Sequence, residues 1–308
     1  MSWQPTASLA ALKARAKLID DIRAFFKARN ILEVETPLLS ASTGTDPHIN
    51  AIQTKSGHYL QTSPEFAMKR LLASGSGPIF QICKAFRDEE IGQYHRQEFT
   101  MLEWYRPGFD HYQLMDETDA LLQTVFDIHT AARRVSYQAL FEHHLDINPH
   151  QVDIKTLREL AMQHHIFTDQ LNSKDDYLDL LFYHCLQPTL QQATFVYHYP
   201  TSQAALAKIH GNIAERFELF LSGIELANGF HELCDPVEQQ QRFNNDVAKR
   251  QQLGKAAVTI DQRFLAALEH SLPHCAGIAL GIDRLLMITL NCDRIDATIS
   301  FANEIEDS

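Results

Sequence analysis

Apolar residues recur along the chain with two different periods, which together predict a mixture of helices and strands. Over 8–29 they recur every three or four residues, which indicates an amphipathic helix capped by Ser8. The same spacing predicts helices over 112–126, 153–164 and 176–187. A period of two residues marks the strands between them, and polar, turn-rich segments separate the elements.

Two strands joined by a polar loop form the most informative stretch, and they cover 79–86 and 98–105. Because side chains two residues apart share one face of a strand, Phe99, Glu103 and Tyr105 point the same way. That face therefore carries an aromatic ring, a carboxylate and a phenol in a row. An ordinary hairpin with solvated charges is the alternative, but a carboxylate inside an apolar strand requires a partner.

The ends of these strands carry charged residues suited to ligands. Arg87 follows the first strand and Glu89 begins the loop. An arginine can hold a phosphate or a carboxylate through two parallel hydrogen bonds, and a phenylalanine can stack on a base. This combination favours a binding site for an anionic ligand that carries an aromatic ring.

A second predicted hairpin turns at Ser222 and Gly223 and carries one glutamate on each strand. Glu225 is expected opposite Phe220, with Glu218 diagonal to it on the same face. Two carboxylates that face each other repel unless a cation joins them, and hard oxygen ligands suit Mg²⁺. A pair of exposed sheet carboxylates without a metal is the alternative interpretation.

Two helix starts add further candidates. Ser63 is expected to cap a helix with Pro64 at its first position, which places Glu65 in the first turn, beside a strand end. A purely electrostatic role at the helix terminus is the alternative for Glu65. Near the end of the chain, a glycine-containing strand runs into an apolar helix, and Arg284 lies at that junction, where helix N-termini bind phosphate.

Composition limits the classes of function. The chain has 308 residues with 45% hydrophobic content, enough for a sizeable core. A net charge of −12 argues against a large nucleic-acid-binding surface. Five scattered cysteines without a CxxC pair favour reduced thiols in the cytoplasm, and the 16 histidines, without an HExxH motif, are interpreted mostly as surface residues. Neither a membrane span nor a signal peptide is predicted.

Three segments resemble, in order, the three motifs of the class II aminoacyl-tRNA synthetases. The first helix with ILEVETP resembles motif 1, the stretch 86–105 resembles motif 2, and AGIALGIDRLLMITL resembles motif 3. The segments TSPE, ERFE and IELANGFHEL are similar to lysyl-tRNA synthetase. The resemblance implies an α+β fold, with an antiparallel sheet flanked by helices. It implies one catalytic domain over 1–308 with a helical insertion at about 131–194, and motif 1 implies a homodimer.

The chain also departs from lysyl-tRNA synthetase. Only one helix precedes ILEVETP, too little for an OB-fold anticodon-binding domain, so no stable tRNA binding is expected. The segments YHRQEFTMLEWYRP and GIELANGFHEL resemble the elongation factor P–(R)-β-lysine ligases, truncated paralogues that activate an amino acid as an adenylate and pass it to a lysine of elongation factor P. Ala279 replaces the middle glycine of motif 3, which implies a different amino-acid backbone in the pocket. Motif 2 departs as well: Asp88 replaces the usual Asn, and Arg96-Gln97 replaces an Asn-Pro pair in the loop.

The resemblance implies a complete set of site residues for ATP, Mg²⁺ and (R)-β-lysine or lysine. Arg87 would act at the α-phosphate and the substrate carboxylate, and Arg284 at the γ-phosphate, as the catalytic pair. Phe99 would stack on adenine. The implied ATP contacts are Arg87, Asp88, Glu89, Arg96, Phe99, Glu225, Leu226, Gly281 and Arg284. The implied Mg²⁺ ligands are Glu218 and Glu225. The implied amino-acid contacts are Ser63, Pro64, Glu65, Glu103, Tyr105, Asn228, Glu232 and Ala279.

Two other functions remain open at this point. A truncated lysine-activating enzyme could charge tRNA or another acceptor, although Ala279 and the missing domain argue against it. A non-catalytic paralogue is the second alternative, and the presence of both motif arginines and all the pocket carboxylates argues against that.

Overall fold

A mixed sheet forms the centre of the molecule. The computed structural model describes residues 3–302 except 89–90, 127, 167–170 and 172. Within these residues nine strands form the sheet, in the order β1-β4-β5-β11-β10-β9-β7-β6 with β8 beside β9, and only β1–β4 and β6–β7 are parallel pairs. Its strands are β1 (Leu32–Glu33), β4 (Ile79–Phe86), β5 (Glu98–Pro107), β6 (Arg133–Ser136), β7 (Thr194–Pro200), β8 (Ile209–His210), β9 (Ile213–Leu221), β10 (Ile224–His231) and β11 (Cys275–Gly281). A separate pair joins β2 (Leu39–Ser40) to β3 (Tyr59–Leu60).

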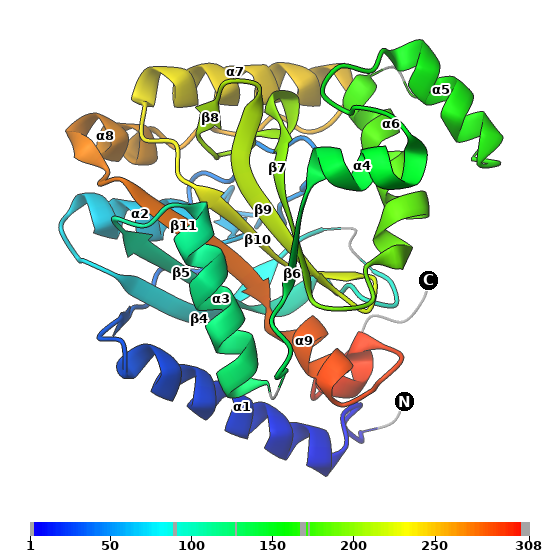
Figure 1. Cartoon of the computed structure of the whole chain (residues 1–308). Helices are drawn as coiled ribbons and strands as arrows, with labels where there is room; N and C mark the ends of the chain where they lie inside the picture. Colours follow the sequence, from blue (N-terminus) through cyan, green and yellow to red (C-terminus); the bar gives the residue numbers. More distant parts are fainter. Residues whose placement is uncertain (1–2, 89–90, 127, 167–170, 172, 303–308) are drawn as a thin grey trace.

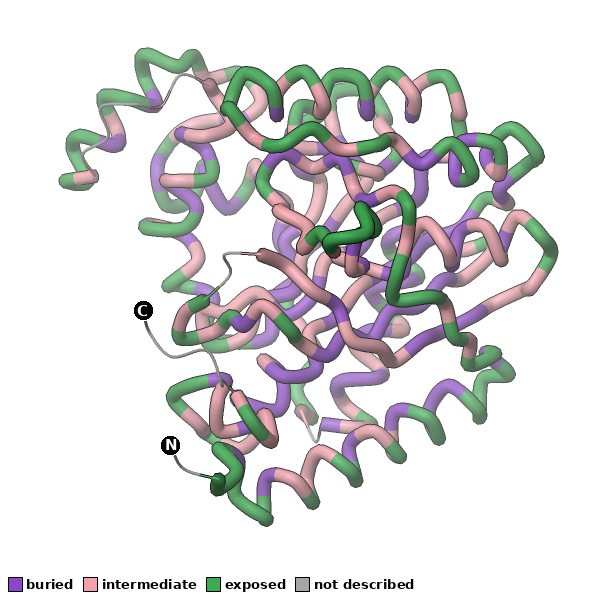
Figure 2. Tube along the Cα trace, turned by 180° about the vertical axis from the view of Figure 1, so that it is seen from behind, coloured by how far each residue is buried: buried purple, intermediate pink, exposed green. Residues whose placement is uncertain are grey.

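Helices surround the sheet, as Figure 1 shows, and this arrangement confirms the predicted α+β class. They are α1 (Leu9–Lys27), α2 (Glu65–Ala73), α3 (His111–Val125), α4 (Tyr137–Leu145), α5 (Ile154–Gln163), α6 (Lys174–Leu181), α7 (Pro236–Gln252), α8 (Gln262–Ser271) and α9 (Ile282–Thr289). Figure 2 shows the central strands largely buried and exposed residues on the outer turns of the helices. Among the described residues, no helix combines the length and hydropathy needed to span a bilayer.

The two faces of β5 have different neighbours, as the two-residue period predicts. Leu102 and Trp104 join the large core beneath α1, α3 and α9, where Phe26 packs against Phe80 and Trp104. Tyr105 on the other face belongs to a second core with α2, α7 and α8. A third core lies under α4 and α6, against β7 and β9. The second and third cores cover opposite ends of one sheet face, and the strands between them are left to line a site.

The predicted insertion contains more structure than its sequence indicated. Strand β6 and helix α4 were not predicted, and β6 extends the central sheet through its parallel pairing with β7. The helix predicted over 176–187 begins at Lys174, and its last part is a π-helix over Phe182–Leu186. That wider turn is frequent at functional sites.

The start of α2 also differs from the prediction. The helix begins at Glu65, Pro64 occupies the cap position, and no side chain makes a cap hydrogen bond. The hydroxyl of Ser63 instead accepts a hydrogen bond from the Glu65 N–H at 3.1 Å and donates one to Glu103 at 2.8 Å. Ser63 therefore joins the helix start to the strand, rather than capping the helix.

The hairpin of β9 and β10 contains a bulge that determines which side chains share a face. Glu225 pairs with Phe220, as predicted, but the register shifts between Glu225 and Ala227, and Asn228 pairs with Glu218. In a regular strand Glu225 and Asn228 would point to opposite faces. Because the bulge adds one residue, both point to the same face. The hairpin turn itself is as predicted, with positive φ at Ser222 and Gly223.

Candidate active site

A cavity of about 990 Å³ lies on the sheet face between the two smaller cores. Its floor is formed by β5, β9, β10 and β11, and its walls include residues of α2, α6 and the π-helix. It brings together ten of the predicted site residues: Ser63, Glu65, Arg87, Glu103, Tyr105, Glu218, Glu225, Asn228, Glu232 and Ala279. These come from six separate parts of the chain, so the fold itself assembles the set.

One end of the cavity holds a buried cluster of acidic side chains around a single lysine. Lys69 is fully buried, and its Nζ lies 2.6 Å from carboxylate oxygens of both Glu65 and Glu232. Glu103 accepts a hydrogen bond from the Tyr105 hydroxyl at 2.7 Å. The sequence interpretation missed Lys69, although its position four residues after Glu65 on a predicted helix allows an ion pair.

The protonation of this cluster reflects burial and crowding of like charges. Burial and the Glu65 carboxylate together raise the pKa of Glu103 to about 7, against the lowering effect of the hydrogen bonds from Tyr105 and Ser63. Burial raises the pKa of Glu232 to about 8, although Lys69 acts in the opposite direction. Burial alone would lower the pKa of Lys69, but Glu232 and Glu65 together raise it above its ordinary value. Lys69 is therefore cationic, and burial makes the carboxyl groups of Glu103 and Glu232 harder to ionise.

Two buried acceptors in this region lack hydrogen-bond donors. Neither Glu232 Oε1 nor Asn228 Oδ1 has a hydrogen-bond partner among the described residues. Each such atom costs about 1–3 kcal/mol when it stays unsatisfied. Both side chains line the cavity, so a ligand with N–H groups would satisfy them.

Motif 3 supplies the shape of this end of the cavity. A Cβ at Gly277 would lie 2.2 Å from the Tyr105 ring and 2.6 Å from Glu232 Oε1, so only glycine fits there. Ala279 pairs with Glu103 across the sheet and lines the cavity. Its methyl group therefore occupies space next to the buried carboxylates.

The opposite end of the cavity contains an arginine that the sequence interpretation did not assign. Arg216 forms an ion pair with Glu218, which also accepts a hydrogen bond from the Tyr199 hydroxyl at 2.7 Å. Burial raises the pKa of Glu218 to about 7, and Glu225 adds to that rise while Arg216 opposes it. The two glutamates predicted to bind Mg²⁺ are thus close enough to repel.

The two predicted catalytic arginines differ in their relation to the cavity, and the remaining predicted residues that the structure describes do not line it. Arg87 lines the cavity, with its guanidinium 5.1 Å from the centre of the Phe99 ring. Arg284 donates to the Glu225 carbonyl at 2.9 Å and lies 3.9 Å from the Glu225 carboxylate. Gly281 precedes α9 and Leu226 belongs to the main core.

Two of the predicted ATP contacts in the motif 2 loop are engaged elsewhere, and a third is not described. The guanidinium of Arg96 is buried and does not line the cavity. Because a buried charge needs a partner, it forms an ion pair with Asp296. Asp88 accepts a hydrogen bond from Gln97 at 2.9 Å. Glu89 lies outside the described residues.

The insertion, which the sequence interpretation left without a role, forms part of the wall. Tyr137, Asp175, Asp179 and Tyr183 all line the cavity. Burial raises the pKa of Asp179 to about 6. No local motif marks these residues in the sequence. Their position at the cavity depends on how the segment packs against the sheet.

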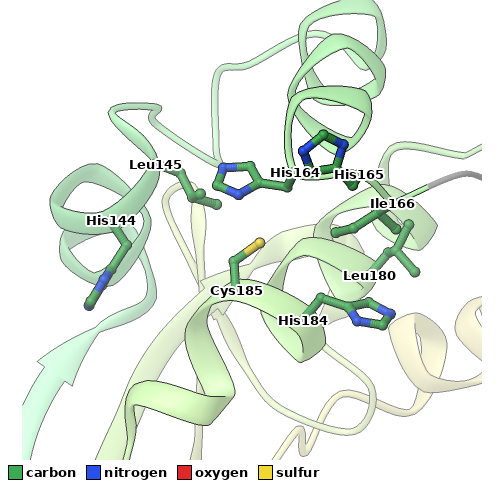
Figure 3. Close-up of a pocket in the computed structure, with 8 residues that line it drawn as sticks. All are labelled: His144, Leu145, His164, His165, Ile166, Leu180, His184 and Cys185. Carbon is green, nitrogen blue, oxygen red and sulfur yellow. The ribbon is translucent and has the colours of Figure 1, made fainter.

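A second hollow, of about 600 Å³, lies within the insertion (Figure 3). Four histidines and Cys185 contribute to its lining, and they come from α4, the end of α5 and the π-helix. Figure 3 shows the four histidine rings spread around the hollow instead of converging on one point. The first cavity, which gathers the predicted site residues, is therefore the better candidate for the active site.

Comparisons with known proteins agree with the geometry. The family model of class II tRNA synthetases (D, K and N) matches residues 2–305. Among curated relatives, proteins named elongation factor P–(R)-β-lysine ligase are similar over nearly their whole length. The one from Hamiltonella defensa subsp. Acyrthosiphon pisum is 46% identical over 98% of both chains. Those from Pseudoalteromonas translucida and Proteus mirabilis are 49% and 48% identical over 97% of both chains.

Proposed function

The chain belongs to the family of class II tRNA synthetases (D, K and N), and from this premise we propose that it is an elongation factor P–(R)-β-lysine ligase. It uses ATP to activate (R)-β-lysine as an aminoacyl-adenylate. It then transfers the aminoacyl group to a lysine side chain of elongation factor P.

The charge balance of the buried cluster carries this proposal. Glu65, Glu103 and Glu232 surround one ammonium group, that of Lys69. If all three carboxylates ionise, two negative charges remain uncompensated in a buried site, which is costly. A substrate with two amines supplies both positive charges and N–H donors for Glu232 Oε1 and Asn228 Oδ1. Lysine and β-lysine have two amines each.

In the first step, the substrate carboxylate attacks the α-phosphorus of ATP, a P–O bond to the β-phosphate breaks, and pyrophosphate leaves. The carboxylate is ionised at neutral pH, so this step requires no general base. It requires in-line placement and compensation of negative charge. Arg87, on the cavity wall, is positioned to hold the two reacting anions together, while the acidic cluster fixes the amines.

In the second step, the amine of the acceptor lysine attacks the carbonyl carbon of the mixed anhydride. The bond from that carbon to the phosphate oxygen breaks, AMP leaves, and the attacking nitrogen gives up a proton. We assign the side of the cavity that the predicted insertion lines to the acceptor, because Asp175 and Asp179 give that wall acidic groups that attract a lysine side chain.

Magnesium fits the opposite end of the cavity. Glu218 and Glu225 both face it, and their mutual repulsion contributes to the raised pKa of Glu218, so a divalent cation between them would relieve that repulsion. When bound, Mg²⁺ would neutralise phosphate charge. Glu218 would then exchange its contact with Arg216 for the metal.

Two further features remain proposals. We place the enzyme in the cytoplasm, where translation factors are modified. We also propose a homodimer, on the basis of the motif 1 segment. Exposed apolar side chains in and near that segment support it, namely Leu32, Leu38 and Leu39.

ATP–pyrophosphate exchange tests the proposed activity. Purified protein should exchange pyrophosphate in the presence of (R)-β-lysine, and more weakly with L-α-lysine. A preference for α-lysine would instead support a truncated lysine-activating enzyme. Lack of exchange with either amino acid would support the non-catalytic paralogue.

A further inference from the structure

A cluster of histidines lies on the face of the sheet opposite the active site. His111 begins α3, His231 ends β10, and Glu215 lies on β9. One ligand atom of each of these three residues falls within 4.8 Å of the other two. Glu215 and His231 alternate with Arg216 and Glu232, which face the active-site cavity, so the cluster occupies the back of the same two strands.

Two more histidines extend the cluster. The Nε2 atom of His198 lies 3.2 Å from that of His111. The Nδ1 atom of His231 faces Glu215, while its Nε2 lies 2.5 Å from the Nε2 of His274. His198 sits at a register shift in β7 with a φ of +61°, a conformation that is uncommon outside glycine. The local backbone therefore departs from regular strand geometry at the residue that contacts His111.

His111 is the least satisfied member. It is only 3% exposed, and its Nδ1 has no hydrogen-bond partner among the described residues. Its Nε2 faces the equivalent nitrogen of another imidazole. A buried ring nitrogen without a hydrogen-bond partner is a position that a ligand can satisfy.

We propose that this cluster binds a transition-metal ion, best matched by Zn²⁺, through His111, His231 and Glu215. Zinc prefers four tetrahedral N and O ligands, and these side chains would supply two imidazole nitrogens and one carboxylate oxygen, with water as the fourth ligand. The contact of His231 Nε2 with His274 gives the ligand the outer partner that metal-bound histidines normally have. The metal would tie α3, β9 and β10 together behind the active site.

Zinc titration of the full-length protein tests this site. The protein is treated with a chelator and titrated calorimetrically with ZnCl₂ in excess Mg²⁺, which occupies the oxygen ligands of the active site. We expect one equivalent to bind, and His111→Gln and Glu215→Gln to weaken binding by at least about tenfold. The matched control is His184→Gln with Cys185→Ser, which removes imidazole and thiol from the insertion hollow and should leave binding unchanged.

Three outcomes would overturn the proposal. The unsubstituted protein does not bind zinc stoichiometrically, both site variants bind zinc as tightly as the unsubstituted protein does, or only the control variant loses binding. Circular dichroism verifies that each variant is folded. If both site variants unfold, the Co²⁺ form of the unsubstituted protein decides the matter. The strong visible absorption of tetrahedral Co²⁺ supports the site, and the weak absorption of octahedral Co²⁺ rejects it.

Discussion

Lys69 and Glu232 form a fully buried ion pair, with 2.6 Å between Nζ and Oε2, at the base of the cavity. Their side chains are each 1% exposed. Glu65 contacts the same ammonium from the other side. A lysine of the protein therefore already holds two of the carboxylates that the substrate amines approach, and it fixes their positions before the substrate binds.

Replacement of Lys69 should destabilise the fold. In Lys69→Met, Glu65 and Glu232 lose their shared cation, and removal of one partner from a buried ion pair typically costs about 3–5 kcal/mol. Urea unfolding of both proteins measures the difference. Lys17→Met is the matched control, because Lys17 also pairs with an acid four residues away but is 75% exposed, and its loss should cost less than about 1 kcal/mol. Equal effects of the two substitutions would contradict this role for Lys69.

Arg87→Ala should abolish amino-acid activation without unfolding the protein. In the proposed mechanism the guanidinium compensates charge that develops during adenylate formation, and loss of one such group typically lowers kcat by about 10²–10³-fold. Pyrophosphate exchange measures the loss. Arg134→Ala is the control, since that exposed arginine pairs with Asp116 outside the cavity, and it should retain full exchange. Normal exchange by Arg87→Ala would reject the assignment.

Stability should depend on pH through the acidic cluster. Burial, with the neighbouring Glu65 carboxylate, raises the pKa of Glu103 to about 7 in the folded protein, against about 4.3 for an unperturbed glutamate. Between these limits the folded state binds more protons than the unfolded state, so the free energy of unfolding falls as pH rises. Glu103→Gln cannot titrate at this position and should flatten the fall in the free energy of unfolding.

Urea unfolding from about pH 5 to about pH 8.5 measures this dependence. Glu98→Gln removes an exposed carboxylate from the same strand and serves as the control, with the slope of the unsubstituted protein. Saturating (R)-β-lysine should also reduce the slope, because two substrate cations favour the ionised carboxylates. An unchanged slope in Glu103→Gln would show that Glu103 does not hold its proton to neutral pH.

The sequence predicted the two-residue period of β5 and the hairpin turn at Ser222-Gly223 because both depend on local chemistry. The same period does not predict that Glu225 and Asn228 share a face, because the bulge between them arises from pairing with β9. Lys69 and Arg216 were missed for a related reason. Each is an ordinary charged residue in its own segment, and its role depends on carboxylates that only the fold brings near.

The position of Ala279 makes a prediction about amino-acid choice. Its methyl group lines the cavity, on the strand position that pairs with Glu103, where glycine would leave more space. Ala279→Gly should therefore admit an amino group on the α-carbon and raise kcat/KM for L-α-lysine relative to (R)-β-lysine. One methyl group in such a pocket is worth about 1–3 kcal/mol, or about 10–200-fold in specificity.

Pyrophosphate exchange with both amino acids gives the ratio of kcat/KM values for each variant. Ala279→Ser keeps nearly the same side-chain volume and should keep the original preference, which separates the effect of space from that of any substitution at this position. If the ratio does not change in Ala279→Gly, the methyl group does not select the substrate. Discrimination would then have to come from the placement of Glu65 and Ser63, which contact each other at the start of α2 and also line the cavity.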